Sequence, residues 1–275
     1  MSALQQKIEQ VKTVLAEAAR DFSPVTFSNS MGAEDMVLTD IIARLPHPNP
    51  LPMPSPQSSP ASGRGGEREK QLLISAGEGA NESLRDAFIN IEMFSLDTGR
   101  LPQETYDLMQ EVRKRYSVPL KIYFPDAAQV EKYVAQNGVN GFYDSVENRK
   151  ACCHMRKVEP LKRALAGKKA WITGMRRDQA VTRAGLEVSS YDADHGLQKF
   201  NPLLDWTNAE VWEYIKQNNV PYNKLHDQFY PSIGCAPCTR AVTPGEDIRS
   251  GRWWWENAEG KECGLHVASI PIKRV

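Results

Sequence analysis

Short apolar segments alternate with longer amphipathic ones along most of this chain, and this alternation constrains its fold more than any other feature. The pattern predicts strands at 25–27, 89–96, 120–124 and 169–173, and helices at 8–19, 36–43, 102–116, 130–136, 158–166 and 208–218. Repeated strand and helix alternation is typical of a parallel sheet covered by helices on both faces. We therefore expect an α/β fold with a doubly wound, mostly parallel sheet.

The first predicted strand runs into a small, polar turn at 28–35 that contains Gly32. The helix predicted at 36–43 follows directly. A strand, such a loop and a helix in this order form the nucleotide-binding unit of many α/β proteins. The sequence therefore favours a nucleotide as ligand at this loop.

A proline-rich segment interrupts the alternation. Seven of the 18 prolines lie between Pro46 and Pro60, and a run rich in Gly, Arg and Glu continues to Gly79. Such a composition supports neither a strand nor a packed core, so we interpret about 46–81 as a disordered insertion. It joins a helix to the next strand, opposite the sheet edge at which such folds bind ligands. We expect one domain over 1–275, with a loop-rich C-terminal part and a mobile tail at about 256–275.

Charge and composition limit the partners of this protein. Lys plus Arg number 34 and Asp plus Glu also number 34, so no overall field favours a nucleic acid. No apolar run is long enough to cross a bilayer, and the first residues lack the apolar core of a signal peptide. We therefore expect a cytoplasmic protein with a small-molecule partner and no membrane association. The oligomeric state stays open, with a homo-oligomer among the options.

Four of the five cysteines form two close pairs. Cys152 and Cys153 are adjacent, and Cys235 and Cys238 are separated by Ala-Pro. Four thiolates are what a [4Fe-4S] cube or a structural zinc ion requires. Adjacent cysteines favour the cube, because its separate iron corners are easier for neighbouring side chains to reach than one zinc ion. Ordinary buried thiols remain the third interpretation.

The fifth cysteine, Cys263, stands apart from the pairs. Lys261 and His266 flank it, and cationic neighbours lower the pKa of a thiol and raise its thiolate fraction. A terminal segment would also let the sulfur travel to a substrate. On its own such a cysteine is usually incidental, so its assignment as a nucleophile depends on the residues around it.

Eight segments together give the chain a resemblance to the bacterial adenosine 5′-phosphosulfate (APS) reductases of the sulfonucleotide reductase family. The matching segments are 28–35, 96–100, 152–157, 174–179, 201–203, 230–240, 251–256 and 261–266. Two residues depart from the family pattern, Asn29 in the loop and Ala180 after Gln179. The resemblance implies a Rossmann-like sheet related to the PP-loop pyrophosphatases and the adenine nucleotide alpha hydrolases.

The resemblance also implies the site. Cys152, Cys153, Cys235 and Cys238 would hold one [4Fe-4S] cluster, and Cys263 would be the catalytic nucleophile. A substrate that joins a phosphate to a sulfate needs several cations and N–H donors around it. The substrate contacts that we expect are Ser28, Ser30, Asp97, Thr98, Gly99, Lys157, Arg176, Arg177, Arg249, Arg252 and His266.

The implied activity is thioredoxin-dependent reduction of APS to sulfite and AMP, in sulfate assimilation and cysteine biosynthesis. Cys263 would carry an S-sulfocysteine intermediate, and thioredoxin or a similar dithiol donor would come from another protein. The alternatives are reduction of the 3′-phosphorylated substrate (PAPS) or dual specificity, a PP-loop ATP-dependent adenylating or tRNA-thiolating enzyme, and a non-enzymatic four-cysteine module. We expect the three tryptophans at 253–255 to pack in a core or a partner surface rather than to stack on a base.

Overall fold

The computed structural model describes residues 1–45, 91–116, 119–179, 183 and 185–256. The insertion predicted at 46–81 and the tail that carries Cys263 and His266 therefore lie outside the described residues, as does Ala180. Within the described part, no helix is both long and apolar enough to cross a membrane.

Six strands form one sheet in the order β3-β2-β1-β4-β6-β5. The strands are β1 (Val25–Ser28), β2 (Ile91–Leu96), β3 (Leu120–Tyr123), β4 (Ala170–Ile172), β5 (Ser189–Asp192) and β6 (Leu197–Phe200). All neighbouring pairs are parallel except β5 and β6. The expected α/β fold with a doubly wound, mostly parallel sheet is thus confirmed.

The strand order reverses at β1. Val25 of β1 pairs with Ile91 of β2 on one side and with Ala170 of β4 on the other. Parallel sheets bind ligands in the crevice outside the carboxyl ends of their strands, where the order reverses. The carboxyl ends of β1 and β4 therefore mark the place for a ligand site.

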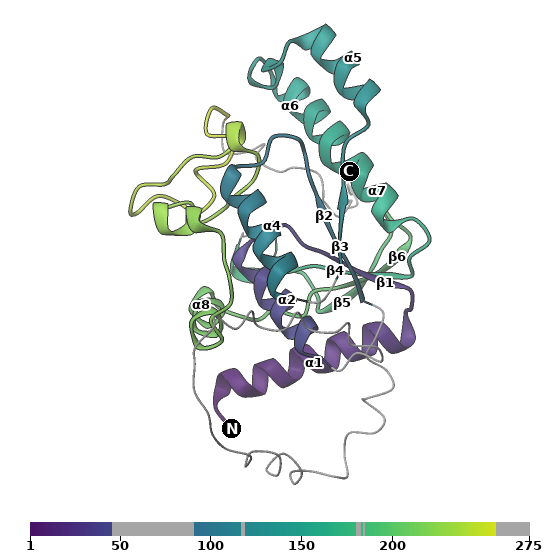
Figure 1. Cartoon of the computed structure of the whole chain (residues 1–275), viewed down its shortest axis with the longest axis vertical. Helices are drawn as coiled ribbons and strands as arrows, with labels where there is room; N and C mark the ends of the chain where they lie inside the picture. The colour runs from purple at the N-terminus through teal and green to yellow at the C-terminus, as the bar shows by residue number, and fades with distance from the viewer. Residues whose placement is uncertain (46–90, 117–118, 180–182, 184, 257–275) are drawn as a thin grey trace, which may run out of the picture.

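Helices cover both faces of the sheet (Figure 1). The α-helices of the described part of the chain are α1 (Ala3–Asp21), α2 (Ala33–Arg44), α4 (Gln103–Arg115), α5 (Ala127–Asn137), α6 (Val146–Cys153), α7 (Glu159–Leu165) and α8 (Asn208–Gln217). The main hydrophobic core joins α1, α2, α4 and α8 to one face, where Val25, Phe27 and Ile172 are fully buried. On the other face α7 packs over Phe94 and Trp171. Neighbouring strand residues point to opposite faces, which explains why both faces carry apolar side chains.

The predicted helices are all present, and local signals fix several of their starts. Ser2 and Asp126 accept hydrogen bonds from backbone N–H groups in the first turns of α1 and α5. Thr207 and Glu210 form a complete capping box at the start of α8. These caps satisfy donors that a helix cannot satisfy internally.

The sequence analysis missed the β5–β6 hairpin and α6. A π-helix (η2, His154–Val158) continues α6 directly into α7. Short 3-10 helices occur at 141–143 (η1), 177–179 (η3), 224–228 (η5) and 236–238 (η6). The part after α8 is loop-rich, as expected.

A second, smaller core lies beyond the sheet. It gathers residues from α5 to η2 and from the loop after η5, namely Tyr133, Phe142, Cys152, Met155, Cys235, Cys238 and Trp253. We call residues 127–158 and 232–256 the cysteine lobe. In Figure 1, α5 and α6 lie together at one end of the molecule, with α1 at the opposite end.

Candidate functional site

A cavity of about 790 Å³ opens at the carboxyl ends of the parallel strands. Its walls come from the segments that follow β1, β2 and β4, together with the loop at 231–249. Sites for small ligands and cofactors are usually clefts of about 300–1,000 Å³. The cavity therefore has the place and the size expected of a nucleotide site; we call it the nucleotide cavity.

The β1–α2 loop is held by its own side chains. Asp35 Oδ2 accepts hydrogen bonds from the backbone N–H of Ser30 at 2.7 Å and from its hydroxyl at 2.6 Å. Asn29 Oδ1 accepts from the N–H of Met31 at 2.8 Å, and Asn29 Nδ2 donates to Thr39 Oγ1. Met31 itself adopts a left-handed backbone conformation with φ of 63°. Asn29, which departs from the family pattern, thus braces the loop.

Asp35 is buried beneath this loop, and burial raises the pKa of its carboxyl to about 6 despite the hydrogen bonds from Ser30. Gly174 approaches Asp35 so closely that an added Cβ would lie 2.2 Å from Asp35 Oδ1. Only glycine therefore fits at this point of the β4 loop.

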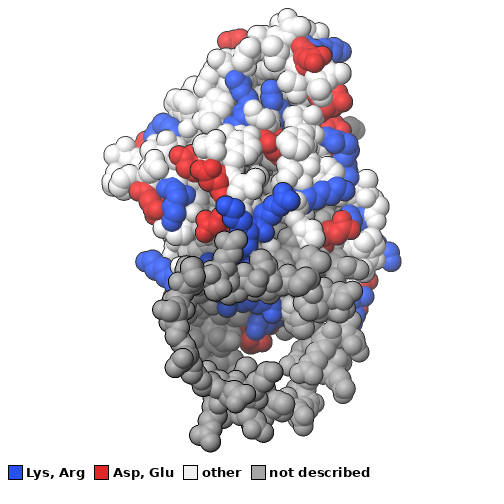
Figure 2. Space-filling view, viewed as in Figure 1, with Lys and Arg blue, Asp and Glu red and all other residues white. Residues whose placement is uncertain are grey.

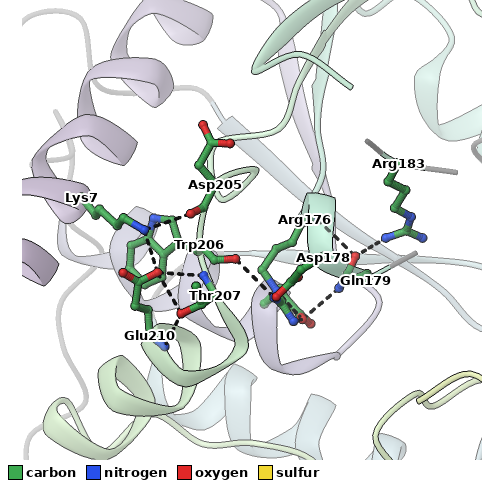
Figure 3. Close-up of polar contacts among 10 residues, drawn as sticks. Lys7, Arg176, Asp178, Gln179, Arg183, Asp205, Trp206, Thr207 and Glu210 are labelled. Carbon is green, nitrogen blue, oxygen red and sulfur yellow. Dashed lines mark hydrogen bonds and ion pairs between the residues drawn. The ribbon is translucent and has the colours of Figure 1, made fainter. Parts of the chain in front are cut away.

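Arg176, in the segment after β4, lines the cavity. Figure 3 shows the polar contacts around it. Arg176 pairs with Glu34, its Nε lying 2.9 Å and its second terminal nitrogen 2.8 Å from Glu34 Oε1. Its other terminal nitrogen contacts Asp178 and the carbonyl of Trp206. Arg177 points elsewhere, because it is partly exposed and pairs with Asp205 at 2.8 Å.

In the turn at the end of β2, some residues stabilise the turn and another lines the nucleotide cavity. Asp97 accepts from the N–H of Gly99 at 2.7 Å and from the hydroxyl of Tyr106 at 2.9 Å, so it stabilises the turn. Gly99 has a φ of 70°, which favours glycine. Thr98 lines the nucleotide cavity, and its Oγ1 lies 3.2 Å from Cys235 Sγ.

The four paired cysteines line one small cavity in the cysteine lobe. All four are buried and not joined by disulfides. Cys152 and Cys153 end α6, while η6 carries Cys238 and begins just after Cys235. Hydrogen bonds hold η6 in place. The N–H of Ala236 donates to Arg100 O (2.8 Å), and the Tyr143 hydroxyl donates to Pro237 O (2.7 Å). Thr239 Oγ1 donates to Cys235 O (2.9 Å).

Cationic groups surround this thiol cavity. Arg100, Arg149, Arg156 and Lys157 line it together with the cysteines. Burial raises the pKa of Cys238 to about 12, while Lys157 and Arg252 oppose that rise. Burial also raises the pKa of Cys152, against the effect of Arg156. As free thiols these groups stay protonated, and binding to metal is what would deprotonate them.

Lys157 connects the two cavities, because it lines both of them. It lies in the π-helix directly after the cysteine pair, and π-helical turns are frequent at functional sites. Arg249 also lines the nucleotide cavity. Arg252 does not, because it is buried between the ring of Trp253, 4.8 Å from its guanidinium carbon, and Gly234.

The structure thus brings together part of the predicted substrate site. The predicted residues that line the nucleotide cavity are Ser28, Ser30, Thr98, Lys157, Arg176 and Arg249. Asp97, Gly99, Arg177 and Arg252 lie outside its walls, and Cys263 and His266 lie outside the described residues. The sequence analysis missed Glu34, Asp35 and Arg183 as wall residues. Glu34 and Asp35 lie in the predicted loop at 28–35. Carboxylates are not expected to bind an anionic substrate, so the sequence analysis did not select them.

Known proteins resemble the chain in sequence over most of its length. Residues 24–241 match the phosphoadenosine phosphosulfate reductase domain family. A protein named adenosine 5′-phosphosulfate reductase from Allochromatium vinosum is 47% identical, over 92% of this chain and 82% of that protein. One of the same name from Burkholderia cepacia is 44% identical, over 96% of this chain and 89% of that protein.

Solved structures agree with the fold. A phosphoadenylyl-sulfate reductase from Candida auris, solved as a phosphate complex, superposes with a TM-score of 0.59 at 24% identity, covering 88% of this chain and 98% of that one. An FMN adenylyltransferase from Candida glabrata gives 0.51 at 16% identity, covering 92% and 72%. At these identities the similarity supports the fold alone.

Proposed function

Because this chain belongs to the phosphoadenosine phosphosulfate reductase family, we propose that it reduces adenosine 5′-phosphosulfate to sulfite and AMP. The curated relatives that are 42–47% identical over at least 92% of this chain carry the name of that activity. It is an oxidoreductase that acts on a sulfur group, in the assimilation of sulfate. Its electron donor is thioredoxin or a similar dithiol protein.

The observation that carries this proposal is the position of Lys157 between the nucleotide cavity and the thiol cavity. A nucleotide in the first cavity can reach Lys157 with its charged end, next to the four cysteines. A plain nucleotide-binding protein needs no such thiol cavity beside its ligand. The arrangement supports a sulfonucleotide whose sulfate lies toward the cysteine lobe.

The residues of the thiol cavity fit a [4Fe-4S] cluster held by Cys152, Cys153, Cys235 and Cys238. The four thiols line one cavity, and the adjacent pair Cys152 and Cys153 suits separate iron corners better than a single zinc ion. In the part of the chain that the structure describes, the buried Nε of Arg156 and the indole nitrogen of Trp253 have no hydrogen-bond acceptor. Such donors would suit the sulfur atoms of an anionic cluster.

The chemistry of the proposed reaction needs a nucleophile and cations. The thiolate of Cys263 attacks the sulfate sulfur, the bond from sulfur to the bridging oxygen breaks, and AMP leaves with that oxygen on its phosphate. Lys157 and Arg249 stabilise the negative charge on the sulfate and the departing phosphate. The cluster, when bound, would add its electrostatic field at the boundary between the two cavities.

A dithiol then completes the reaction. One of its sulfurs attacks Cys263 Sγ. The bond between Cys263 Sγ and the SO₃ group breaks, and sulfite leaves with the bonding electron pair. The second sulfur of the donor resolves the mixed disulfide and restores Cys263. Two electrons pass from the donor, which becomes a disulfide, to the sulfur that leaves as sulfite.

One anaerobic experiment tests the proposal against its main alternative. Purified protein is given APS or its 3′-phosphorylated form with reduced thioredoxin, and sulfite release is measured. We expect release from APS, with iron and sulfide at about four each per chain. Sulfite from the 3′-phosphorylated substrate alone would establish the alternative activity, and stoichiometric zinc without sulfide would overturn the cluster.

A further inference from the structure

A buried lysine lies behind one wall of the nucleotide cavity. Lys199 of β6 pairs in register with Trp171 of β4, so the two side chains lie on the same face of the sheet. The ammonium of Lys199 lies over the Trp171 ring, 4.7 Å from its centroid, and the lysine is buried. Trp171 itself lines the nucleotide cavity. A buried cation therefore lies directly behind the surface that a ligand would touch.

This wall belongs to the part of the cavity that holds Lys157. Leu161 packs with Trp171 in one apolar cluster, and both line the cavity. Lys157 precedes Leu161 by about one turn in the continuous helical segment of η2 and α7, and it also lines the cavity. Residues about one turn apart lie on the same face of a helix. Lys199 thus lies on the side of the cavity where the proposed function puts the anionic part of the nucleotide.

Other positive groups also face the nucleotide cavity. Arg249 lines it, and so does the N-terminus of α2, where the cap residue Gly32 makes no side-chain hydrogen bond. A helix N-terminus favours negative charge. Arg183 lines the cavity as well and donates to Gln179 (Figure 3). Guanidinium and backbone N–H groups keep their protons near neutral pH, whereas burial can bring the deprotonation of a lysine close to it.

The surroundings of Lys199 have this effect. Burial lowers the pKa of its ammonium to about 8, Asp192 of β5 opposes that shift, and Arg183 adds to it. Asp192 also contacts His195, whose Nδ1 lies 3.1 Å from each carboxylate oxygen and whose ring centroid lies 5.5 Å from that of Trp171. From the helix side, α7 covers this face with the apolar side chains of Leu161, Ala164 and Leu165. A lysine in this setting gains or loses its proton according to the charge that is brought near it.

We propose that Lys199 is a positioning residue for the nucleotide, an inference that rests on the proposed binding of a sulfonucleotide in this cavity. From behind Trp171 its ammonium attracts the phosphate of the bound nucleotide, and the lysine takes up a proton when an anionic ligand enters. The attraction acts through a packed layer of side chains that excludes water, so salt screens it little. By linkage, the proton and the anion strengthen each other's binding.

Calorimetry of AMP binding to the cluster-loaded protein tests this. Titrations at about pH 8, in two phosphate-free buffers of different ionisation enthalpy, give the number of protons taken up per ligand. We expect about 0.3–0.5 proton per AMP, because about half of the Lys199 side chains are neutral before binding at this pH. The affinity for AMP should fall about fivefold between about pH 7 and pH 9. Adenosine, which carries no phosphate, should bind without proton uptake.

Two variants of Lys199 separate its charge from its packing. Lys199→Met keeps an unbranched apolar stem over Trp171 and removes the charge, so it should abolish the uptake and weaken AMP binding about tenfold at neutral pH. Lys199→Arg keeps a charge that does not titrate, so AMP should bind with the parent's affinity but without proton uptake. The difference between parent and variant also separates Lys199 from other groups that titrate near this pH, such as the thiol of Cys263.

Lys121→Met is the matched control. Lys121 also extends from a strand over an aromatic ring, with its ammonium 4.8 Å from the centroid of Tyr123, but the lysine is exposed and Tyr123 does not line the nucleotide cavity. This variant should bind AMP with the affinity and the proton uptake of the parent. A loss of uptake here equal to that in Lys199→Met would contradict the inference, because any lost lysine charge would then suffice.

AMP binding by the parent without proton uptake would overturn the inference, as would an uptake that persists in Lys199→Met. Equal losses of affinity in Lys199→Met and Lys199→Arg, with the pH profile of the parent retained, would leave Lys199 a packing role only. The uptake by the parent is measured without any substitution, so the test holds even where a variant does not fold. A parent that binds no AMP and releases no sulfite would instead overturn the proposed function, and the inference with it.

Discussion

The sheet and the cysteine lobe achieve their stability in different ways. The main core is built from aliphatic and aromatic side chains, and the fully buried Asp40 beside it is well satisfied. The hydroxyls of Tyr116 and Tyr214 donate to it at 2.9 and 2.8 Å, and Arg44 pairs with it at 2.7 Å. These contacts join α2, α4 and α8 without any cofactor.

The core of the lobe is small, and three of its seven residues are cysteines. It also contains a buried ion pair between Arg149 and Glu256 at 2.8 Å, with both side chains at most 4% exposed. We therefore expect the sheet to fold mainly by hydrophobic burial, and the lobe to depend on the proposed group that links its thiols. On the part of the face that Figure 2 shows in colour, Lys and Arg side chains lie among Asp and Glu side chains.

The largest expected effect comes from neither region. Cys263→Ser should lower turnover at least about a thousandfold, because it removes the proposed nucleophile. The iron and sulfide content should stay unchanged, since the four paired cysteines remain. In the parent protein without a reductant, one equivalent of APS should give one AMP and an SO₃ adduct, located by peptide mapping. An adduct on Cys152 or Cys235 would contradict the division of roles.

Cys235→Ser should affect the cysteine lobe and leave the sheet intact. It removes a proposed cluster ligand and the sulfur that Thr98 contacts. We therefore expect loss of iron, sulfide and the absorbance near 400 nm, with at least about a hundredfold less activity. Limited proteolysis should then cut the lobe faster while the sheet stays protected. Cys263→Ser is the matched control, because it also exchanges one sulfur for oxygen. Equal loss of protection throughout the chain would show that the sheet also depends on the cluster.

Arg149→Met should destabilise the lobe by about 3–5 kcal/mol, because it leaves Glu256 buried without its partner. Chemical denaturation followed by tryptophan fluorescence would measure this, since Arg149 lies over the ring of Trp253. The double variant Arg149→Met with Glu256→Leu should recover part of the loss. A single variant as stable as the parent would show that the pair contributes nothing net.

Tyr214→Phe tests the sheet side. Removing the hydroxyl that donates to Asp40 should lower the free energy of unfolding by about 2 kcal/mol, because the acceptor is charged and buried. Cluster content and activity should not change. A loss of iron in this variant would mean that the two regions are energetically coupled.

The smallest effect is expected from the proline-rich segment. Replacing residues 46–81 by a short Gly/Ser link should change the free energy of unfolding by only about 1–2 kcal/mol, since loop entropy varies slowly with length. Activity should stay within severalfold of the parent. A hundredfold loss in a folded, cluster-loaded deletion would show that the segment takes part in function.

Periodicity was enough to predict the parallel strands and the helices around them, because each buries an apolar face of regular spacing. It failed for β5, whose Ser189, Ser190 and Asp192 carry no such pattern, and for the polar helix α6. Those elements form because the sheet edge and the lobe provide partners for them. These partners are distant in the sequence, so the local pattern of residues does not predict them.

The sequence by itself determined the α/β fold, the family and the grouping of four cysteines into two close pairs. Each of these depends on neighbouring residues or on a regular period. Only the tertiary structure decided which charged residues line the nucleotide cavity. Arg177 and Arg252 carry the same guanidinium as Arg176, yet one pairs at the surface and the other packs on Trp253. The position of Glu34 in the cavity wall could not be foreseen, because its partner Arg176 lies 142 positions away in the chain.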